Sequence, residues 1–77
     1  MAAYTIIADE RRHIAVEPFS IDALHEAAAS LNIKRCWFHS GRFPHYDMPK
    51  RRIEELKSKC KLVSSRELLE VIKRGQA

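Results

Sequence analysis

Aromatic rings, titratable groups and basic side chains lie next to one another in the stretch Trp37-Phe38-His39-Ser40-Gly41-Arg42-Phe43-Pro44-His45-Tyr46-Asp47-Met48-Pro49-Lys50-Arg51-Arg52. It contains the only Trp of the chain, two of the three Phe and two of the four His. A solvated loop has no need of so many rings, and a core strand has no need of a basic run. The stretch therefore predicts a binding or catalytic loop between a buried strand and a helix.

The segment before this stretch predicts two strands followed by a helix. Residues 4–8 and 13–17 are rich in β-prone side chains, and Pro18 ends the second run. The short charged link between them suits a hairpin, with the mutual direction of the two strands left open. A helix is expected from the N-cap Ser20, with apolar residues at helical spacing, to a left-handed residue at Asn32.

The rest of the chain predicts alternating strands and helices. Residues 34–39 are expected to form a third strand. A second helix should begin near Pro49, with Asp47 or Met48 as its cap. Residues 62–63 predict a short fourth strand, and the Ser-Ser-Arg-Glu run that follows is a capping box for a third helix.

Together these elements predict one small α/β domain over residues 1–77, in the order ββαβαβα. The strand, helix and strand over residues 13–39 should form a right-handed βαβ unit, so that its two strands are parallel. We therefore expect a mostly parallel sheet of three or four strands with three helices. At this length a hydrophobic core alone is barely sufficient for stability.

Charge is unevenly distributed along the chain. Residues 1–33 hold two Lys/Arg and five Asp/Glu, a net of −3, whereas residues 34–77 hold twelve and five, a net of +7. A basic half favours phosphate-bearing partners or an acidic protein surface. No apolar run suits a membrane span and no secretory signal is recognisable, so we expect a cytoplasmic protein without a membrane partner. Cys36 and Cys60 are expected to be buried, structural thiols.

Short motifs are spread over most of the chain. They are Ile6-Ile7-Ala8-Asp9, His13-Ile14, Leu24-His25, Trp37-Phe38, His45-Tyr46-Asp47, a basic residue at Arg51 or Arg52, and Val63-Ser64. In these motifs the chain resembles a small bacterial and phage family catalogued as domain of unknown function 4031, although its link after Asp9 is shorter. The resemblance implies the fold and a prokaryotic or phage origin, and it implies no activity.

The expected sheet brings polar side chains to one edge. Ligands bind beyond the carboxyl ends of the strands in open parallel sheets. If the first strand is parallel to the others, Asp9, residues 39–47 and Ser64-Ser65 follow such ends and meet there. The N-termini of the second and third helices point to the same edge, and helix N-termini favour anions.

The leading hypothesis is a non-enzymatic module that binds a phosphate-bearing ligand, preferably nucleic acid or a nucleotide, through residues 39–52. Basic side chains bind phosphates, and aromatic rings stack on bases. The expected ligand-binding residues are Trp37, His39, Arg42, His45, Tyr46, Lys50, Arg51, Arg52 and Ser64. This function requires no cofactor.

The second hypothesis is a metal-dependent phosphodiesterase or nuclease. His45 and Asp47, with Asp9 as a further candidate, would act as metal ligands or as acid and base. His39 is another possible ligand of a divalent metal. A structural zinc site with Cys36 and the two histidines is disfavoured, because a second Cys-rich half is missing and Cys36 is expected to point into the core.

The third hypothesis is a phage or bacterial regulator that binds a host protein, with Trp37, Phe43 and Tyr46 as anchors. A structural interpretation also remains open. Trp37 would then fill the core, and residues 45–47 would form a hydrogen-bonded turn before the second helix. His25, at the edge of an apolar stripe, is expected to be a half-buried packing residue.

Overall fold

The first two strands form an antiparallel hairpin in the computed structural model, which describes residues 3–76. β1 (Thr5–Ala8) pairs with β2 (His13–Glu17), and the link is closed by a bond from the Asp9 N–H to the His13 carbonyl (3.1 Å). Arg12 in this link has a φ of 72°. The expected hairpin is confirmed, and the direction that the sequence left open is antiparallel.

Helix α1 (Ile21–Ser30) begins and ends at the predicted capping residues. The Ser20 Oγ accepts a hydrogen bond of 3.1 Å from an N–H of the first turn. Asn32 has a φ of 58°, and the Ile33 N–H donates to the Ala28 carbonyl at 2.9 Å. This geometry satisfies carbonyls that the helix end would otherwise leave unpaired.

The main departure from the expected fold lies in residues 34–47. A 3₁₀ turn (Arg35–Trp37) leads into β3 (Phe38–His39), and the chain then turns back into β4 (His45–Asp47). Gly41 in the connection has a φ of 135°, which side-chain-bearing residues rarely adopt. The expected long strand and loop are therefore a β-hairpin.

The sheet order is β3-β4-β2-β1-β5, with β5 at Lys61–Leu62. β4 lies between β2 and β3 and is antiparallel to both, and among residues 3–76 the one parallel neighbour pair is β1–β5. The prediction of a mostly parallel sheet is wrong: within residues 3–76 it has five strands and is mostly antiparallel. A tight local hairpin places β4 where the βαβ unit would have placed its third strand.

The second half of the chain contains two further helices. A 3₁₀ turn (Lys50–Arg52) precedes α2 (Ile53–Lys59). Asp47 or Met48 was expected as the cap of this helix, but Asp47 is the last residue of β4, and Pro49 and Arg52 hold the N-cap positions of the turn and of α2. α3 (Ser65–Gln76) follows the predicted cap Ser64, whose Oγ accepts a 3.1 Å bond from an N–H of its first turn.

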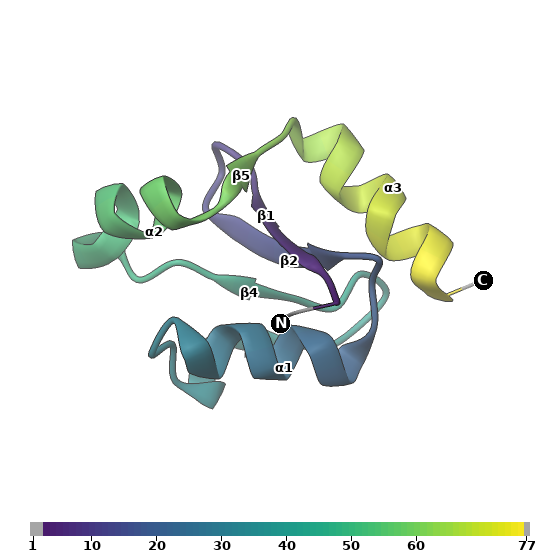
Figure 1. Cartoon of the computed structure of the whole chain (residues 1–77), viewed down its shortest axis with the longest axis horizontal. Coiled ribbons are helices and arrows are strands. Elements are labelled where there is room, and N and C mark those ends of the chain that lie inside the picture. The colour runs from purple at the N-terminus through teal and green to yellow at the C-terminus, as the bar shows by residue number, and fades with distance from the viewer. Residues whose placement is uncertain (1–2, 77) are drawn as a thin grey trace.

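Both faces of β2 are covered by the hydrophobic core. Ile14, Ala15 and Val16 are each at most 1% exposed. α1 and α3 both contact β2, and Figure 1 shows the sheet between these two helices. Further along that sheet, His13 of β2 and His45 and Asp47 of β4 are only partly covered.

The two cysteines differ in their surroundings. Cys36 is exposed and Cys60 is half-buried, and burial raises the pKa of the Cys60 thiol. The expected burial of Cys36 is wrong because residues 35–37 form a 3₁₀ turn, in which the alternation of a strand does not apply. In the part of the chain that the structure describes, no helix has the length and apolar character that crossing a bilayer needs.

Candidate functional site

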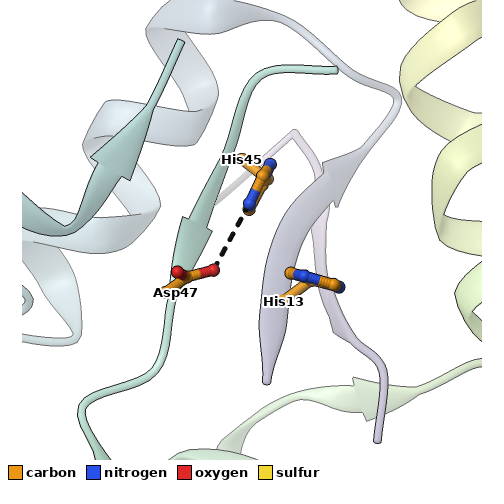
Figure 2. A group of neighbouring side chains, drawn as sticks. All are labelled: His13, His45 and Asp47. Carbon is orange, nitrogen blue, oxygen red and sulfur yellow. Dashed lines mark ion pairs between the residues drawn. The ribbon is translucent and has the colours of Figure 1, made fainter. Parts of the chain in front are cut away.

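Four polar side chains share one face of strands β2, β3 and β4. In the antiparallel register His13 lies opposite Asp47, and His39 lies opposite His45. Side chains alternate along a strand, so residues 45 and 47 point to one face and Tyr46 to the other. Figure 2 shows His13, His45 and Asp47 extending to the same side of β2 and β4. We call these three residues the His–Asp cluster.

The His–Asp cluster is close enough to hold one ion. Each of its residues offers one ligand atom, and these atoms lie within 4.8 Å of one another. The His45 Nε2 is 3.3 Å from Asp47 Oδ1, and the His13 and His45 rings meet edge to face with centroids 4.8 Å apart. The side chains are 36%, 23% and 31% exposed for His13, His45 and Asp47, so solvent reaches a site whose backbone is fixed by the sheet.

The ring of His45 is oriented by the hairpin loop. Its Nδ1 lies 2.7 Å from the Phe43 carbonyl. A carbonyl oxygen only accepts, so Nδ1 carries the proton and the neutral ring keeps its lone pair on Nε2. That lone pair faces Asp47 Oδ1, which is also an acceptor. Two acceptors at this separation call for a shared cation, either a proton or a metal ion.

The ring of His13 is oriented by the buried carboxylate of Asp9. The Asp9 side chain, 1% exposed, accepts from the backbone N–H groups of Arg11 and His13, both at 2.9 Å, through Oδ1. Its Oδ2 accepts from His13 Nδ1 at 2.9 Å and from Ser65 Oγ at 2.7 Å. The lone pair of His13 therefore remains on Nε2.

These contacts also determine the charge of Asp9. Burial alone would raise the pKa of the Asp9 carboxyl, but the hydrogen bonds from His13 and Ser65 outweigh burial, and its pKa is lowered. Asp9 is thus an ionised anchor that joins the end of β1, the start of β2 and the start of α3. Its acceptor positions are occupied, so it orients His13 and is not itself placed to bind a ligand.

His39 supports the cluster from the edge strand. Its Nε2 donates to Asp47 Oδ2 at 2.8 Å, and its ring stacks on that of His45 with centroids 5.2 Å apart. Asp47 is thereby held through one oxygen while its other oxygen faces His45. The His39 side chain is 53% exposed and lies outside the three-residue cluster.

This arrangement suits a divalent metal ion. Two imidazoles and one carboxylate with open positions are a common ligand set for catalytic metals. Metal-binding histidines usually donate their second N–H to a carboxylate or carbonyl, as His13 does to Asp9 and His45 to Phe43. Ligands of one ion at bonds of about 2.0–2.2 Å lie about 3.0–3.5 Å apart. The 3.3 Å between His45 and Asp47 falls within that range.

Two aromatic residues that were expected to bind a ligand, Trp37 and Tyr46, lie outside the His–Asp cluster. Trp37 is half-buried and packs against the core. Tyr46 is 1% exposed, and its hydroxyl lies 2.7 Å from His25 Nδ1, on the face of β4 opposite the cluster. The guanidinium of Arg35 donates to His25 Nε2 at 3.2 Å, so the Nδ1–H of His25 donates to the Tyr46 hydroxyl. Burial, followed by the charge of Arg35, lowers the pKa of His25.

The expected basic residues divide into two groups. Arg52 donates to the carbonyls of Leu31 (2.7 Å) and Asn32 (2.9 Å) at the end of α1 and also bonds Glu55. These bonds use its guanidinium within the fold. Lys50 and Arg51, directly before it, are exposed.

Two other predicted residues lie apart from the cluster. Arg42 is exposed in the hairpin loop, with its guanidinium 5.9 Å from the centre of the Phe43 ring. Ser64 is the cap of α3, and its neighbour Ser65 makes the bond to Asp9. Of the residues predicted from the sequence, the structure therefore brings together His39, His45, Asp47 and, through His13, Asp9.

His13 was missed as a site residue. The available signal was its position four residues after Asp9, at the start of a strand. Its proximity to Asp47 depends on the register between β2 and β4, and β4 was expected to be a loop.

Comparison with known proteins adds one finding. No curated protein and no solved structure matches the chain. The family described as "Protein of unknown function (DUF4031)" matches residues 7–75. This range includes the His–Asp cluster, Asp9, His39 and Ser65. The match confirms the resemblance seen in the motifs, and the chain belongs to this family.

Proposed function

We propose that this protein is a hydrolase that uses a divalent metal ion to cleave phosphoesters. The observation that carries the proposal is the close approach of His45 Nε2 and Asp47 Oδ1, which lie 3.3 Å apart with a ring nitrogen of His13 nearby. A metal ion between these two atoms would be bound by both of them. His13, His45 and Asp47 are the proposed ligands.

The chemistry follows from the open coordination positions. A metal with three protein ligands lowers the pKa of a bound water and polarises a phosphoryl oxygen. Asp9 and the Phe43 carbonyl hold the two imidazoles in the tautomer that presents Nε2. His39 holds Asp47 from the edge strand through its Nε2.

Phosphoesters are favoured over other substrates by the charges beside the cluster. Arg11 and Arg12 directly precede His13, and Lys50 and Arg51 follow Asp47 within four residues. Such side chains neutralise phosphate oxygens and support the charge that develops in phosphoryl transfer. A neutral peptide or carboxylic ester carries no negative charge for these side chains to neutralise.

The test has a binding arm and a turnover arm. Calorimetric titration of the metal-free protein with Zn²⁺, Mn²⁺ and Mg²⁺ should give one site per chain, which His45→Ala and Asp47→Asn remove. His25→Gln is the matched control, because it also removes one histidine, but one whose two ring nitrogens are both bonded within the protein. Release of nitrophenol from bis(p-nitrophenyl) phosphate should require the same metal and the same three ligands.

The outcomes separate the functions. Metal binding and metal-dependent turnover that both disappear in His45→Ala support the hydrolase. Absence of binding for all three ions would overturn the metal centre. Tight nucleic-acid binding without any metal or turnover would favour the non-enzymatic binding module instead.

A further inference from the structure

Two basic dipeptides that are far apart in the sequence lie side by side in the fold. Arg11-Arg12 is in the link between β1 and β2, and Lys50-Arg51 begins the turn before α2. The Met48 N–H donates to the Arg12 carbonyl at 2.9 Å, which fastens the two segments together. We call these four side chains the cationic rim.

The cationic rim is at the end of the sheet that carries the His–Asp cluster. His13 and Asp47 are paired across β2 and β4. Arg12 precedes the first of them and Lys50 follows the second by three residues, so both dipeptides leave the sheet beside the proposed metal ligands. The link that carries the two arginines is held by Asp9, the same carboxylate that orients His13.

The charges of the cationic rim are available to a ligand. Among residues 3–76, none of its four side chains takes part in an ion pair, whereas Arg52 and Lys59 share Glu55. Three of the four are exposed and Arg12 is half-exposed. Four unpaired cations on two adjoining segments exceed what a single phosphate needs, and they match a ligand with several phosphates in a row.

We propose that the cationic rim binds successive phosphates of a nucleic-acid strand and so places one phosphodiester at the His–Asp cluster. The role of the cluster in this inference rests on the proposed function, but binding by the rim does not require metal. The substrate class is therefore a polynucleotide and not a small phosphate monoester.

The experiment measures binding to fluorescently labelled oligonucleotides by anisotropy, with EDTA present and at increasing salt. Four phosphate contacts on a single strand predict a slope of log affinity against log salt of about −2.8, and removal of two contacts should reduce it to about −1.4. Single- and double-stranded DNA and RNA are compared, and poly-glutamate represents an acidic protein surface.

Two variants each remove half of the cationic rim. They are Arg11→Ala/Arg12→Asn and Lys50→Ala/Arg51→Ala. Asn is used at position 12 because it tolerates the positive φ found there. Lys73→Ala/Arg74→Ala is the charge-matched control, since it removes two positive charges from the far end of α3, near Phe19. All variants are first compared by thermal unfolding.

Both rim variants should weaken binding several-fold and reduce the salt slope, while the control changes neither. Equal effects of all three variants, equal binding of poly-glutamate, or no binding at low salt would overturn the inference. His45→Ala in the same assay separates the two proposals. If it retains nucleic-acid binding but wild-type protein shows no metal-dependent cleavage, the proposed function fails and the rim stands. If bis(p-nitrophenyl) phosphate is cleaved in a metal-dependent manner but nucleic acid is not bound, the proposed function stands and the inference about the cationic rim is overturned.

Discussion

The two faces of β4 place histidines in opposite chemical situations. On one face, both ring nitrogens of His25 are bonded within the protein, to Tyr46 and Arg35. On the other face, His13 and His45 each have Nδ1 anchored by an acceptor, and the Nε2 of His45 lies 3.3 Å from Asp47 Oδ1. The residue type is the same, but only the second arrangement has ring nitrogens that accept no hydrogen bond from another side chain within residues 3–76. The number of anchored nitrogens therefore distinguishes a packing histidine from a candidate ligand.

Removal of a proposed ligand of the His–Asp cluster should give the largest effect. The effect should be on metal binding and turnover, at the face of β4 that carries the cluster. Removal of a residue that only hydrogen-bonds to a metal ligand lowers metal affinity or activity by roughly 10–100-fold. His45→Ala removes a proposed ligand itself, so it should lower metal affinity and turnover by more than this. Stability of the metal-free protein should change little, because the side chain is partly exposed. Titration calorimetry and thermal unfolding measure the two quantities. A large loss of stability with unchanged metal affinity would show that His45 is a structural residue like His25.

Substitution of Asp9 should lower both the free energy of unfolding and the metal affinity of the His–Asp cluster. Asp9→Ala leaves two backbone N–H groups and the Ser65 hydroxyl without their acceptor and should cost about 3 kcal/mol of unfolding free energy. Asp9→Asn should cost less but should still weaken metal binding about 10–100-fold, since it removes the charge that orients His13. Urea unfolding and metal titration test the pair. Undiminished metal affinity in Asp9→Asn would show that His13 needs no anchor.

Tyr46→Phe should affect only stability, through the face of β4 that carries the contact between Tyr46 and His25. The substitution keeps the buried ring and removes the hydroxyl that accepts from His25, at a cost of about 1 kcal/mol. Metal binding should be unchanged, because Tyr46 points away from the cluster. Urea unfolding of both proteins gives the difference, with metal titration as the control. Weaker metal binding in this variant would contradict the independence of the two faces.

The smallest effect should appear in the pH dependence of stability. The pKa of His25 is lowered from 6.5 in the folded protein. As the pH falls below about 6.5, the unfolded chain takes up a proton that the folded protein does not, so the free energy of unfolding decreases. His25→Gln lacks this contribution. Between pH 8 and pH 5 the wild type should lose more stability than His25→Gln; equal losses would place the responsible group elsewhere.

The sequence was sufficient where local chemistry determines structure. Ser20, Asn32 and Ser64 act at the helix ends as predicted, because a cap depends on residues within one turn of it. His45 and Asp47 were also candidates from the sequence, because both are metal-binding residue types within one short stretch rich in titratable groups. Short-range rules therefore predicted the helix ends and two of the three residues of the His–Asp cluster.

The sequence was insufficient where distant segments meet. β3 and β4 have only two and three residues, too few for an alternating pattern to predict strands. Without β4, the opposition of His13 and Asp47 could not be inferred, and Arg51 and Arg52 looked equivalent. Only the fold shows that Arg52 bonds the end of α1 while Arg51 is exposed.

The parallel pairing of β1 with β5 has a consequence for the order in which the molecule assembles. During synthesis, the hairpin of β1 and β2 can form early. The other edge of β1 stays unpaired until residues 61–62, which form β5, have been synthesised. The bond from Ser65 to Asp9 spans 56 positions and can form only after that. Long-range closure of this kind is slow compared with helix formation. The contact between Asp9 and His13 can therefore form within the hairpin, whereas its support from Ser65 requires residue 65 to have been synthesised and packed against the end of β1.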